Sequence, residues 1–423
     1  MPPKKIKILV LTTTFPRYKD DEVPSFVLDL SKEMKNLGAE IIILSPHDKN
    51  AKIKEKIEGM KIIRFPYFFP KKLQRLCYRG GIMYNIKKSY LAKIQIPFFF
   101  IFYFIYSYKI IKTFKIKAIH SHWIIPSGFV GAIFKKFFKI IHISTAHAID
   151  VYTLEKTFLG KIITTFIFKN CDYIVCVSNI LKQKLFNLLI DENDKKYFDK
   201  KVLVKPMGVK LSLNSFTNEL NKEKEKEHFN ILFLGRFVEK KGIKYLIYAF
   251  QKVLEKYKNV KLLLGGTGPL EEEIKFLVAK MNLKDSVKFL GWVPREELPK
   301  IMKEADFIVV PSIVTETGDT EGLPTVIIEA MGMGLPVIAS DVGGIRDIIK
   351  DGVNGLLAVP GNVEDLSFKM MKIIENEELK KKLSKEGKET AKNYRWDKIA
   401  KFYIHLFCKA YPRRYEKIPY NRF

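Results

Sequence analysis

Two carboxylates flank a turn in the segment EGLPTVIIE, in which seven residues separate Glu321 from Glu329. Pro324 suits the first turn of a helix, so we expect a helix to begin near Leu323. Glu321 then lies in the loop before the helix, and Glu329 lies more than one turn inside it. The first backbone N–H groups of a helix have no partner within it, so those of residues 322–325 are predicted to face phosphate or sugar oxygens.

The two acids suit different hydroxyl groups. A carboxylate can accept hydrogen bonds from two hydroxyls at once, so Glu329 suits a ribose diol, and Glu321 suits a sugar ring. The alternative is that both acids are simply favoured by the helix dipole. That alternative accounts well for Glu321 and poorly for Glu329, which lies beyond the first turn.

Two further segments combine glycines with a strand end. In FLGRFVEKKG a strand is predicted to end at Gly235, and Arg236 and Lys241 follow before a helix begins at Gly242. Cations and free N–H groups beyond a strand favour an anion site, although solvated basic residues on a surface loop are the alternative. In LLLGGTGPLEEE the glycines around Gly266 would allow a ligand close to the backbone, but such a turn also occurs without a ligand.

Histidines mark two strand ends in the first half of the chain. His147 follows a predicted strand, with Asp150 three residues later, and a histidine that is merely hydrogen-bonded at a strand end is the alternative to a ligand contact. His120 and His122 alternate on another predicted strand, so both could face one side. A zinc site there needs further ligands that the spacing does not supply, so we expect this pair to line the acceptor side or to support the fold.

Strands and helices alternate along both halves of the chain, which predicts parallel sheets covered by helices on both faces. We therefore expect two doubly wound α/β domains in tandem, with ligands beyond the carboxyl ends of the strands and in the cleft between the domains. The predicted domains are residues 1–206 and 207–392, joined through a charge-dense linker at residues 210–228. A terminal helical segment, residues 393–423, is expected to pack back on the first domain.

The composition is that of a globular protein with a large basic excess. The chain has 423 residues, 47% hydrophobic and 28% charged, and a net charge of +28. Such an excess favours polyanionic partners, but no nucleic-acid-binding motif accompanies it, so we expect no nucleic-acid partner. The four cysteines include no C-x-x-C pair, and the N-terminus reads as a first strand rather than a signal peptide. These features predict a protein of a reducing, cytoplasmic compartment.

Residues 62–111 interleave aromatic side chains with lysine and arginine. Their apolar core, residues 97–106, is shorter than the about 20 residues that cross a bilayer. This composition is shared by interfacial helices on anionic membranes and by buried helices of a domain. The segment by itself is compatible with either interpretation. The overall positive charge favours the interfacial helix, which predicts a peripheral protein at the inner face of the membrane.

The motifs GRFVEKKG, GGTGPL, GWVP and EGLPTVIIEAMGMGLPVIASDVGGIRDII, followed by DGVNGLL, together resemble glycosyltransferase family 4. The resemblance covers most of the second half and extends to the first through HSHWIIPSG, STAHAID and PMGV. It implies the GT-B fold, two Rossmann-like domains facing across a cleft, and a retaining enzyme whose donor is a nucleotide sugar such as a UDP- or GDP-sugar. Glu321 and Glu329 match that family's E-x7-E pair.

The resemblance also implies a role for each residue. Arg236 and Lys241 would bind the diphosphate, Glu329 the ribose, and His147 and Glu321 the transferred sugar. We expect His147, Arg236, Lys241 and Glu321 to be catalytic. The complete predicted donor site is Gly235, Arg236, Lys241, Gly266, Val293, Glu321, Gly322, Leu323, Pro324, Thr325 and Glu329.

The sequence thus predicts a glycosyltransferase that moves a hexose-type sugar to a glycan or lipid-linked acceptor. The chain contains no Asp-x-Asp motif, so fixed cations are expected to replace a metal ion at the diphosphate, and no metal or other cofactor is expected. One alternative is a nucleotide-sugar epimerase of the same fold. Another is a non-enzymatic polyanion-binding protein that keeps the scaffold.

Overall fold

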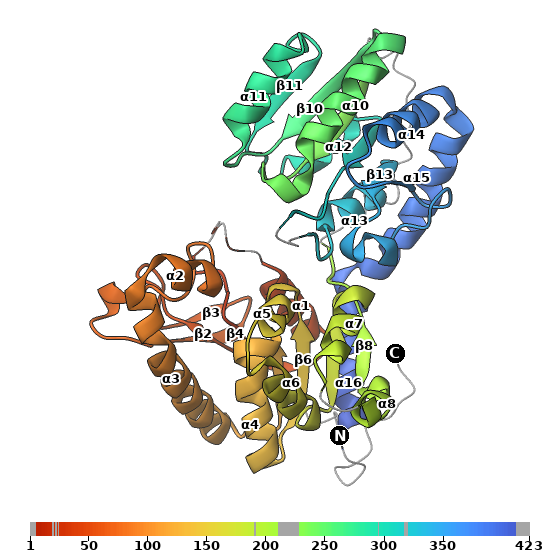
Figure 1. Ribbon diagram of the computed structural model, residues 1–423. Coiled ribbons are helices and arrows are strands. Elements are labelled where there is room, and N and C mark those ends of the chain that lie inside the picture. Colours follow the sequence, from red (N-terminus) through yellow and green to blue (C-terminus); the bar gives the residue numbers. More distant parts are fainter. Residues whose placement is uncertain are drawn as a thin grey trace. The chain divides into compact units, whose positions relative to one another are not determined.

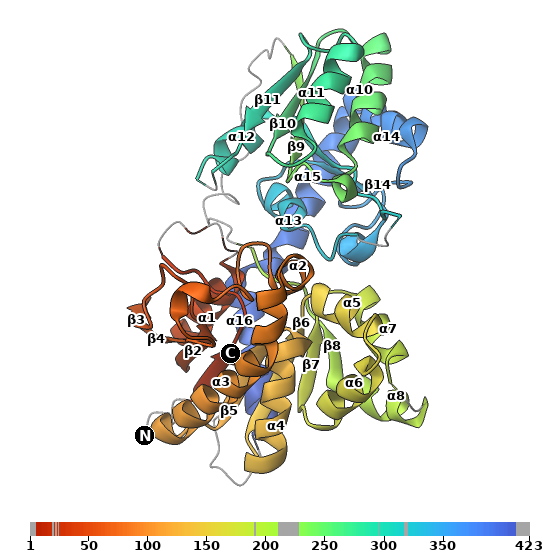
Figure 2. The same ribbon diagram turned by 60° about the vertical axis from the view of Figure 1, so that its left-hand side comes forward.

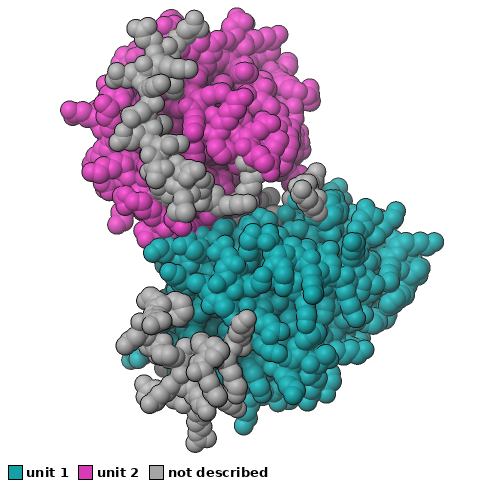
Figure 3. Space-filling model, turned by 180° about the vertical axis from the view of Figure 1, so that it is seen from behind, with its two compact units in different colours: residues 1–208, 396–423 teal, residues 209–395 magenta. Residues whose placement is uncertain are grey.

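The computed structural model describes residues 6–18, 21, 23, 25–189, 192–209, 228–294, 296–316 and 320–411. The chain divides into two compact units, which Figure 3 colours separately. Unit 1 combines residues 1–208 with residues 396–423, and unit 2 is residues 209–395. The predicted linker, except for its last residue, lies outside the described residues.

Unit 1 contains an eight-stranded sheet in the order β3-β4-β2-β1-β5-β6-β7-β8, parallel except where β3 pairs with β4. The hairpin of β3 and β4 was not predicted. The strands are β1 (Lys7–Leu11), β2 (Glu40–Pro46), β3 (Lys54–Ile57), β4 (Met60–Phe65), β5 (Ala118–His122), β6 (Ile141–Ala146), β7 (Tyr173–Cys176) and β8 (Val202–Val204).

Helices cover both faces of this sheet, because successive side chains of a strand point to opposite faces. Ile8 and Val10 join the core under α1 and α16, whereas Leu9 and Leu11 join the core under α3 and α4 (Figure 1). Thus α16, which follows unit 2 in the sequence, completes unit 1. The helices are α1 (Phe26–Asn36), α2 (Ile82–Lys88), α3 (Tyr90–Phe114), α4 (Phe129–Phe138), α5 (Ile149–Glu155), α6 (Gly160–Lys169), α7 (Asn179–Asn187), α8 (Glu192–Phe198) and α16 (Trp396–Ala410).

The helix α3 is longer than the apolar core of ten residues that the sequence suggested. It has 25 residues, and its length and composition would allow it to cross a membrane. A third of its apolar stretch is buried within unit 1. Gln95 is fully buried on its inner face, where its side chain accepts from the backbone N–H of Arg75 and donates to the carbonyl of Leu73. These contacts fix α3 to the segment that follows β4.

Unit 2 contains a six-stranded parallel sheet in the order β11-β10-β9-β12-β13-β14. The chain moves outward from β9 to β11 and then returns to place β12 on the other side of β9. Loops after β9 and β12 therefore diverge at a switch point, where α/β sheets commonly bind ligands. The strands are β9 (Phe229–Leu234), β10 (Val260–Gly265), β11 (Val287–Gly291), β12 (Phe307–Val310), β13 (Val337–Ser340) and β14 (Leu356–Ala358).

The helices of unit 2 again lie on both faces of its sheet. Ile231 and Phe233 of β9 enter one core, and Leu232 and Leu234 enter the other. The first core contains α10 and α14, and the second contains α13. The helices are α10 (Ile243–Lys256), α11 (Glu271–Lys280), α12 (Leu298–Glu304), α13 (Thr325–Gly332), α14 (Val363–Glu375) and α15 (Glu377–Ala391).

Candidate active site

A cavity of about 400 Å³ lies at the switch point of unit 2 and brings three predicted residues together. Arg236 and Lys241 come from the loop after β9, and Glu321 comes from the loop before α13. The Nζ atom of Lys241 lies 3.0 Å from Oε1 of Glu321, and both side chains are mostly buried. The full lining is Arg236, Val238, Glu239, Lys240, Lys241, Thr315 and Glu321. The cavity is therefore rich in cations and is suited to an anionic ligand.

Glycines are required where the loops of this site approach one another. Gly266 has φ +135°, and a Cβ atom there would lie 1.9 Å from the carbonyl oxygen of Gly235. Gly242 has φ +64°, and its Cβ would meet the carbonyl oxygen of Pro311 at the same distance. Gly266 is therefore required for a close approach between two loops of the protein, whereas the approach of a ligand to this turn stays a prediction.

The loop that carries Glu321 is held by a second glycine pair, which the sequence reasoning did not assign. Gly343 has φ +58°, and a Cβ there would lie 2.0 Å from the carbonyl oxygen of Glu321. The N–H of Gly344 donates to the carbonyl of Gly322 over 2.9 Å. The signal for this contact was the Gly-Gly pair after β13. Thr315, Val238, Glu239 and Lys240 also line the cavity and were not predicted.

The helix α13 begins at Thr325, two residues later than we expected. The residue before a proline disfavours helical backbone, which explains why Leu323 stays outside the helix and Pro324 precedes it. Glu329 is the fifth residue of α13 and is half-buried. It does not line the cavity of Lys241, and neither does Val293, whose side chain packs beside Gly265.

Three histidines meet at the carboxyl ends of β5 and β6 in unit 1. Nδ1 of His122 lies 3.0 Å from Nε2 of His147, and the ring centroid of His120 lies 4.3 Å from that of His122. Nε2 of His120 lies 2.9 Å from Oγ1 of Thr145, which in turn lies 2.8 Å from the hydroxyl of Tyr403 on α16. His120 and His122 thus face one side of the sheet, as their spacing suggested.

Burial keeps these rings neutral. It lowers the pKa of His120 and His147 to about 3 and that of His122 well below its ordinary value, and neighbouring histidines add to the effect for His120 and His122. They act as hydrogen-bonding groups at neutral pH rather than as cations. In the described part of the chain, no three His, Cys, Asp or Glu side chains gather as metal ligands, so the zinc alternative for this pair lacks its further ligands.

Asp150 joins the loops that follow β5 and β6. Its Oδ2 accepts the backbone N–H of Ile124 over 2.6 Å, and its Oδ1 accepts that of His147 over 3.1 Å. Trp123 and Ala148, which follow the two histidine positions, have φ of +70° and +96°, values that side-chain-bearing residues rarely adopt. Burial raises the pKa of Asp150 to about 6. Asp150 therefore positions the histidine loops.

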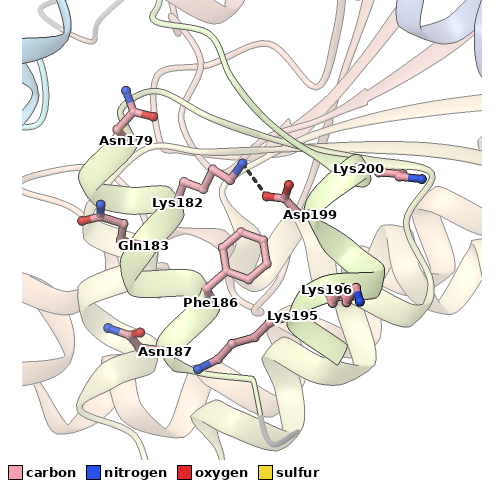
Figure 4. Close-up of a pocket in the computed structure, with 9 residues that line it drawn as sticks. All are labelled: Asn179, Lys182, Gln183, Phe186, Asn187, Lys195, Lys196, Asp199 and Lys200. Atoms are coloured by element: carbon pink, nitrogen blue, oxygen red, sulfur yellow. Dashed lines mark ion pairs between the residues drawn. The ribbon is translucent and has the colours of Figure 1, made fainter. Parts of the chain in front are cut away.

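A larger cavity, of about 700 Å³, lies in unit 1 along α7 and α8 (Figure 4). It is lined mainly by lysine and amide side chains, and Lys182 there forms an ion pair of 2.8 Å with Asp199. None of the predicted site residues lines it. The residues with predicted chemistry instead lie at the strand ends of the two sheets.

Comparisons with known proteins match both halves of the chain. Residues 215–390 match the family described as Glycosyl transferases group 1, and residues 23–195 match Glycosyltransferase Family 4. An uncharacterized glycosyltransferase of Methanocaldococcus jannaschii is 33% identical over 353 residues, which are 82% of this chain and 90% of that relative.

Solved structures give the same fold over nearly the whole chain. Sucrose-phosphate synthase from Thermosynechococcus elongatus has a TM-score of 0.69 at 21% identity, over 95% of this chain and 100% of that one. Anabaena HepE in complex with UDP and glucose has a TM-score of 0.66 at 17% identity, over 96% and 100% of the two chains. The chain belongs to glycosyltransferase family 4 and is a group 1 glycosyltransferase with the GT-B fold.

Proposed function

We propose that the protein is a retaining, metal-independent glycosyltransferase that moves a hexose-type sugar from a nucleotide sugar to a glycan or lipid-linked acceptor. The observation that carries this proposal is the cavity at the switch point of unit 2, which Arg236 lines and in which Lys241 pairs with Glu321. Two cations and an acid match the needs of a sugar diphosphate, which has anionic and hydroxyl groups side by side. The Anabaena protein HepE, which shares the fold, was solved with UDP and glucose.

Each residue has a proposed role in donor binding. Arg236 and Lys241 bind the diphosphate beside the turns at Gly235 and Gly266, which pack closely on each other. Glu329 accepts the ribose hydroxyls, and Val293 lies toward the base. The sugar contacts His147, the carboxylate of Glu321 and the backbone of the segment Gly322, Leu323, Pro324 and Thr325.

The proposed transfer needs no nucleophile from the protein. The bond between the sugar's anomeric carbon and the phosphate oxygen breaks, and an acceptor hydroxyl oxygen bonds to that carbon on the same face. The hydroxyl proton passes to the leaving phosphate. Negative charge grows on that phosphate as the bond breaks, and Arg236 and Lys241 stabilise it without a metal ion.

The acceptor and location are proposed from the charge of the chain. A net charge of +28 favours an anionic membrane surface, and a lipid-linked or membrane-proximal glycan is then within reach. We place the protein at the cytoplasmic face of the membrane, as a peripheral protein.

A transfer assay tests this function. The protein is incubated in EDTA with α-linked UDP-, GDP- and ADP-hexoses and a membrane lipid extract, and the product linkage is assigned from proton coupling constants. The proposal expects an α-linked product from one nucleotide class, and Lys244→Ala, on the exposed side of α10, is the active control. A β-linked product would overturn retention, and free sugar without a glycosylated product would favour the epimerase or a hydrolase.

A further inference from the structure

The outer face of α3 carries a continuous stripe of exposed apolar side chains. Their spacing of four, four, three, four and three residues places them on one side of the helix. The segment from residue 94 to residue 108 contains no charged residue, so the stripe runs uncharged for about 21 Å. The stripe is Tyr90, Ile94, Phe98, Ile101, Ile105 and Tyr108, which are 37% to 83% exposed.

Neighbouring segments widen this stripe into a patch. The ring of Tyr108 lies 5.8 Å from that of Phe138 at the end of α4, where Phe137 is 68% exposed. Phe69 is 58% exposed, and its ring lies 6.1 Å from that of Phe102. Figures 1 and 2 both show α3 and α4 side by side on unit 1. Contiguous exposed apolar patches of this kind mark interaction surfaces.

The fold does not need these outward side chains for its core. The inner face of α3 already fills the core of unit 1 with Phe99 and Tyr103, and Tyr103 stacks on Phe65 at 4.7 Å. The hydroxyl of Tyr103 donates to Ser127 over 3.0 Å. The helix is thus anchored on one side while its opposite side presents aromatic and isoleucine side chains to the outside.

The charge around the patch has one sign. Residues 59–149 contain thirteen lysines and three arginines, and not one aspartate or glutamate. Lys93 lies at one end of the stripe, and Lys109 and Lys112 lie at the other. None of these three exposed lysines forms an ion pair with any residue that the structure describes. Lys93 lies 4.7 Å from the ring of Tyr90, and Lys112 lies 5.7 Å from that of Tyr108.

This charge decides which partner the patch fits. The three-and-four spacing would also suit pairing with α3 of a second copy, as in a coiled coil. Such pairing would bring Lys93, Lys109 and Lys112 of one copy close to those of the other, with no acid on either α3 to offset them, and like charges repel. An anionic bilayer offers phosphates to the lysines and an apolar boundary to the stripe, and amphipathic side chains of this kind bind there.

We propose that α3 docks unit 1 on the surface of an anionic bilayer, with the stripe at the boundary between headgroups and acyl chains and the lysines on the phosphates. This inference rests on the proposed function, which places the protein at an anionic membrane. It adds which residues of α3 contact that membrane. The helix lies on the membrane and does not cross it, because its inner face stays packed on the sheet.

Vesicle flotation tests this docking face. Vesicles of phosphatidylcholine mixed with phosphatidylglycerol, whose anionic headgroups attract lysines, are compared with vesicles of pure phosphatidylcholine. We expect the wild type to float only with the anionic vesicles, and less so in high salt. The triple variant Phe98→Ser, Ile101→Ser, Ile105→Ser is expected to lose at least about tenfold in partitioning, because three apolar side chains no longer enter the boundary.

The matched control is Phe276→Ser with Phe368→Ser, two exposed phenylalanines of unit 2. Equal flotation of the triple variant and the wild type would overturn the proposal. So would a wild-type dimer in sedimentation that the triple variant dissociates, since the patch would then serve a second copy. Titration of every variant with nucleoside diphosphate separates a failure of docking from a failure of the proposed function, and circular dichroism confirms that each variant is folded.

Discussion

The ammonium nitrogen of Lys241 lies 3.0 Å from Oε1 of Glu321, so the loops after β9 and before α13 are joined by an ion pair inside the cavity of unit 2. Both side chains are largely removed from water, where such a pair is far less screened than at the surface. A diphosphate that binds Lys241 must therefore compete with Glu321 for it. Substitutions of Lys241 and of Glu321 are therefore expected to have different effects on nucleoside diphosphate binding.

Lys241→Ala is predicted to weaken nucleoside diphosphate binding. A hydrogen bond to a charged group contributes roughly 1.5–3 kcal/mol, so we expect affinity to fall by about 10- to 150-fold. Calorimetric titration measures this, with Lys244→Ala on the exposed side of α10 as the matched control. Equal affinity in the Lys241 variant and the control would remove Lys241 from the diphosphate site.

Glu321→Gln is predicted to separate binding from transfer. The neutral side chain no longer holds Lys241 as a counter-ion, so nucleoside diphosphate should bind at least as tightly as to the wild type. The transfer rate should nevertheless fall by about 100-fold or more, because a charge beside the sugar is lost. Affinity and the rate at saturating donor are measured on the same preparation. A rate close to wild type would show that Glu321 only braces Lys241.

Gly266→Ala is predicted to destabilise unit 2. The new Cβ would meet the carbonyl of Gly235 at 1.9 Å in a backbone conformation that alanine rarely adopts, so we expect a loss of about 3 kcal/mol or more. Gly352→Ala is the control, since Gly352 has φ +70° but open space around its Cβ position, and strain alone costs about 1 kcal/mol. Scanning calorimetry compares the two transitions; similar shifts would contradict the close approach.

Asp150→Asn is predicted to remove a pH dependence of stability. Burial raises the pKa of Asp150 from 3.8 to about 6, so the folded protein binds this proton more tightly than the unfolded chain does. Its contribution is therefore fully present below pH 3.8 and is lost as pH rises through 6, by about 3 kcal/mol.

The measurement is the difference in unfolding free energy between wild type and Asp150→Asn at pH 4 and pH 7. We expect the wild type to lose about 2.4 kcal/mol relative to the variant over that interval, since a part of the contribution is already lost at pH 4. Buried histidines such as His120 act in the opposite direction, losing stability as pH falls below 6.5, but they are common to both proteins. A difference that does not change with pH would mean that Asp150 is not held in a buried, desolvated position.

The parallel sheets could be predicted because strand and helix patterns alternate along the chain. The hairpin of β3 and β4 could not, and Arg64 shows why. The sequence treats this arginine as part of a basic surface segment, but it is fully buried and donates to the backbone carbonyls of Pro16 and Lys52. A buried arginine with backbone partners has no signature in a single sequence.

Some features of the candidate site could likewise be predicted from the sequence, and others could not. Arg236, Lys241 and Glu321 could be assigned to one donor site because their motifs resemble those of the family, and the structure brings all three to one cavity. The support that Gly343 gives to the carbonyl of Glu321 depends on a backbone approach between distant loops. The ion pair of Lys241 and Glu321 is likewise a matter of distance, which residue spacing along the chain does not encode.

Calorimetric titration of the wild type and Arg236→Ala with UDP, GDP and ADP in EDTA tests the central claim most directly. Metal-independent diphosphate binding by fixed cations predicts that one nucleotide binds the wild type in EDTA and that Arg236→Ala weakens it by about tenfold or more. Equal binding by the variant, or binding by the wild type only after a divalent ion is added, would contradict it.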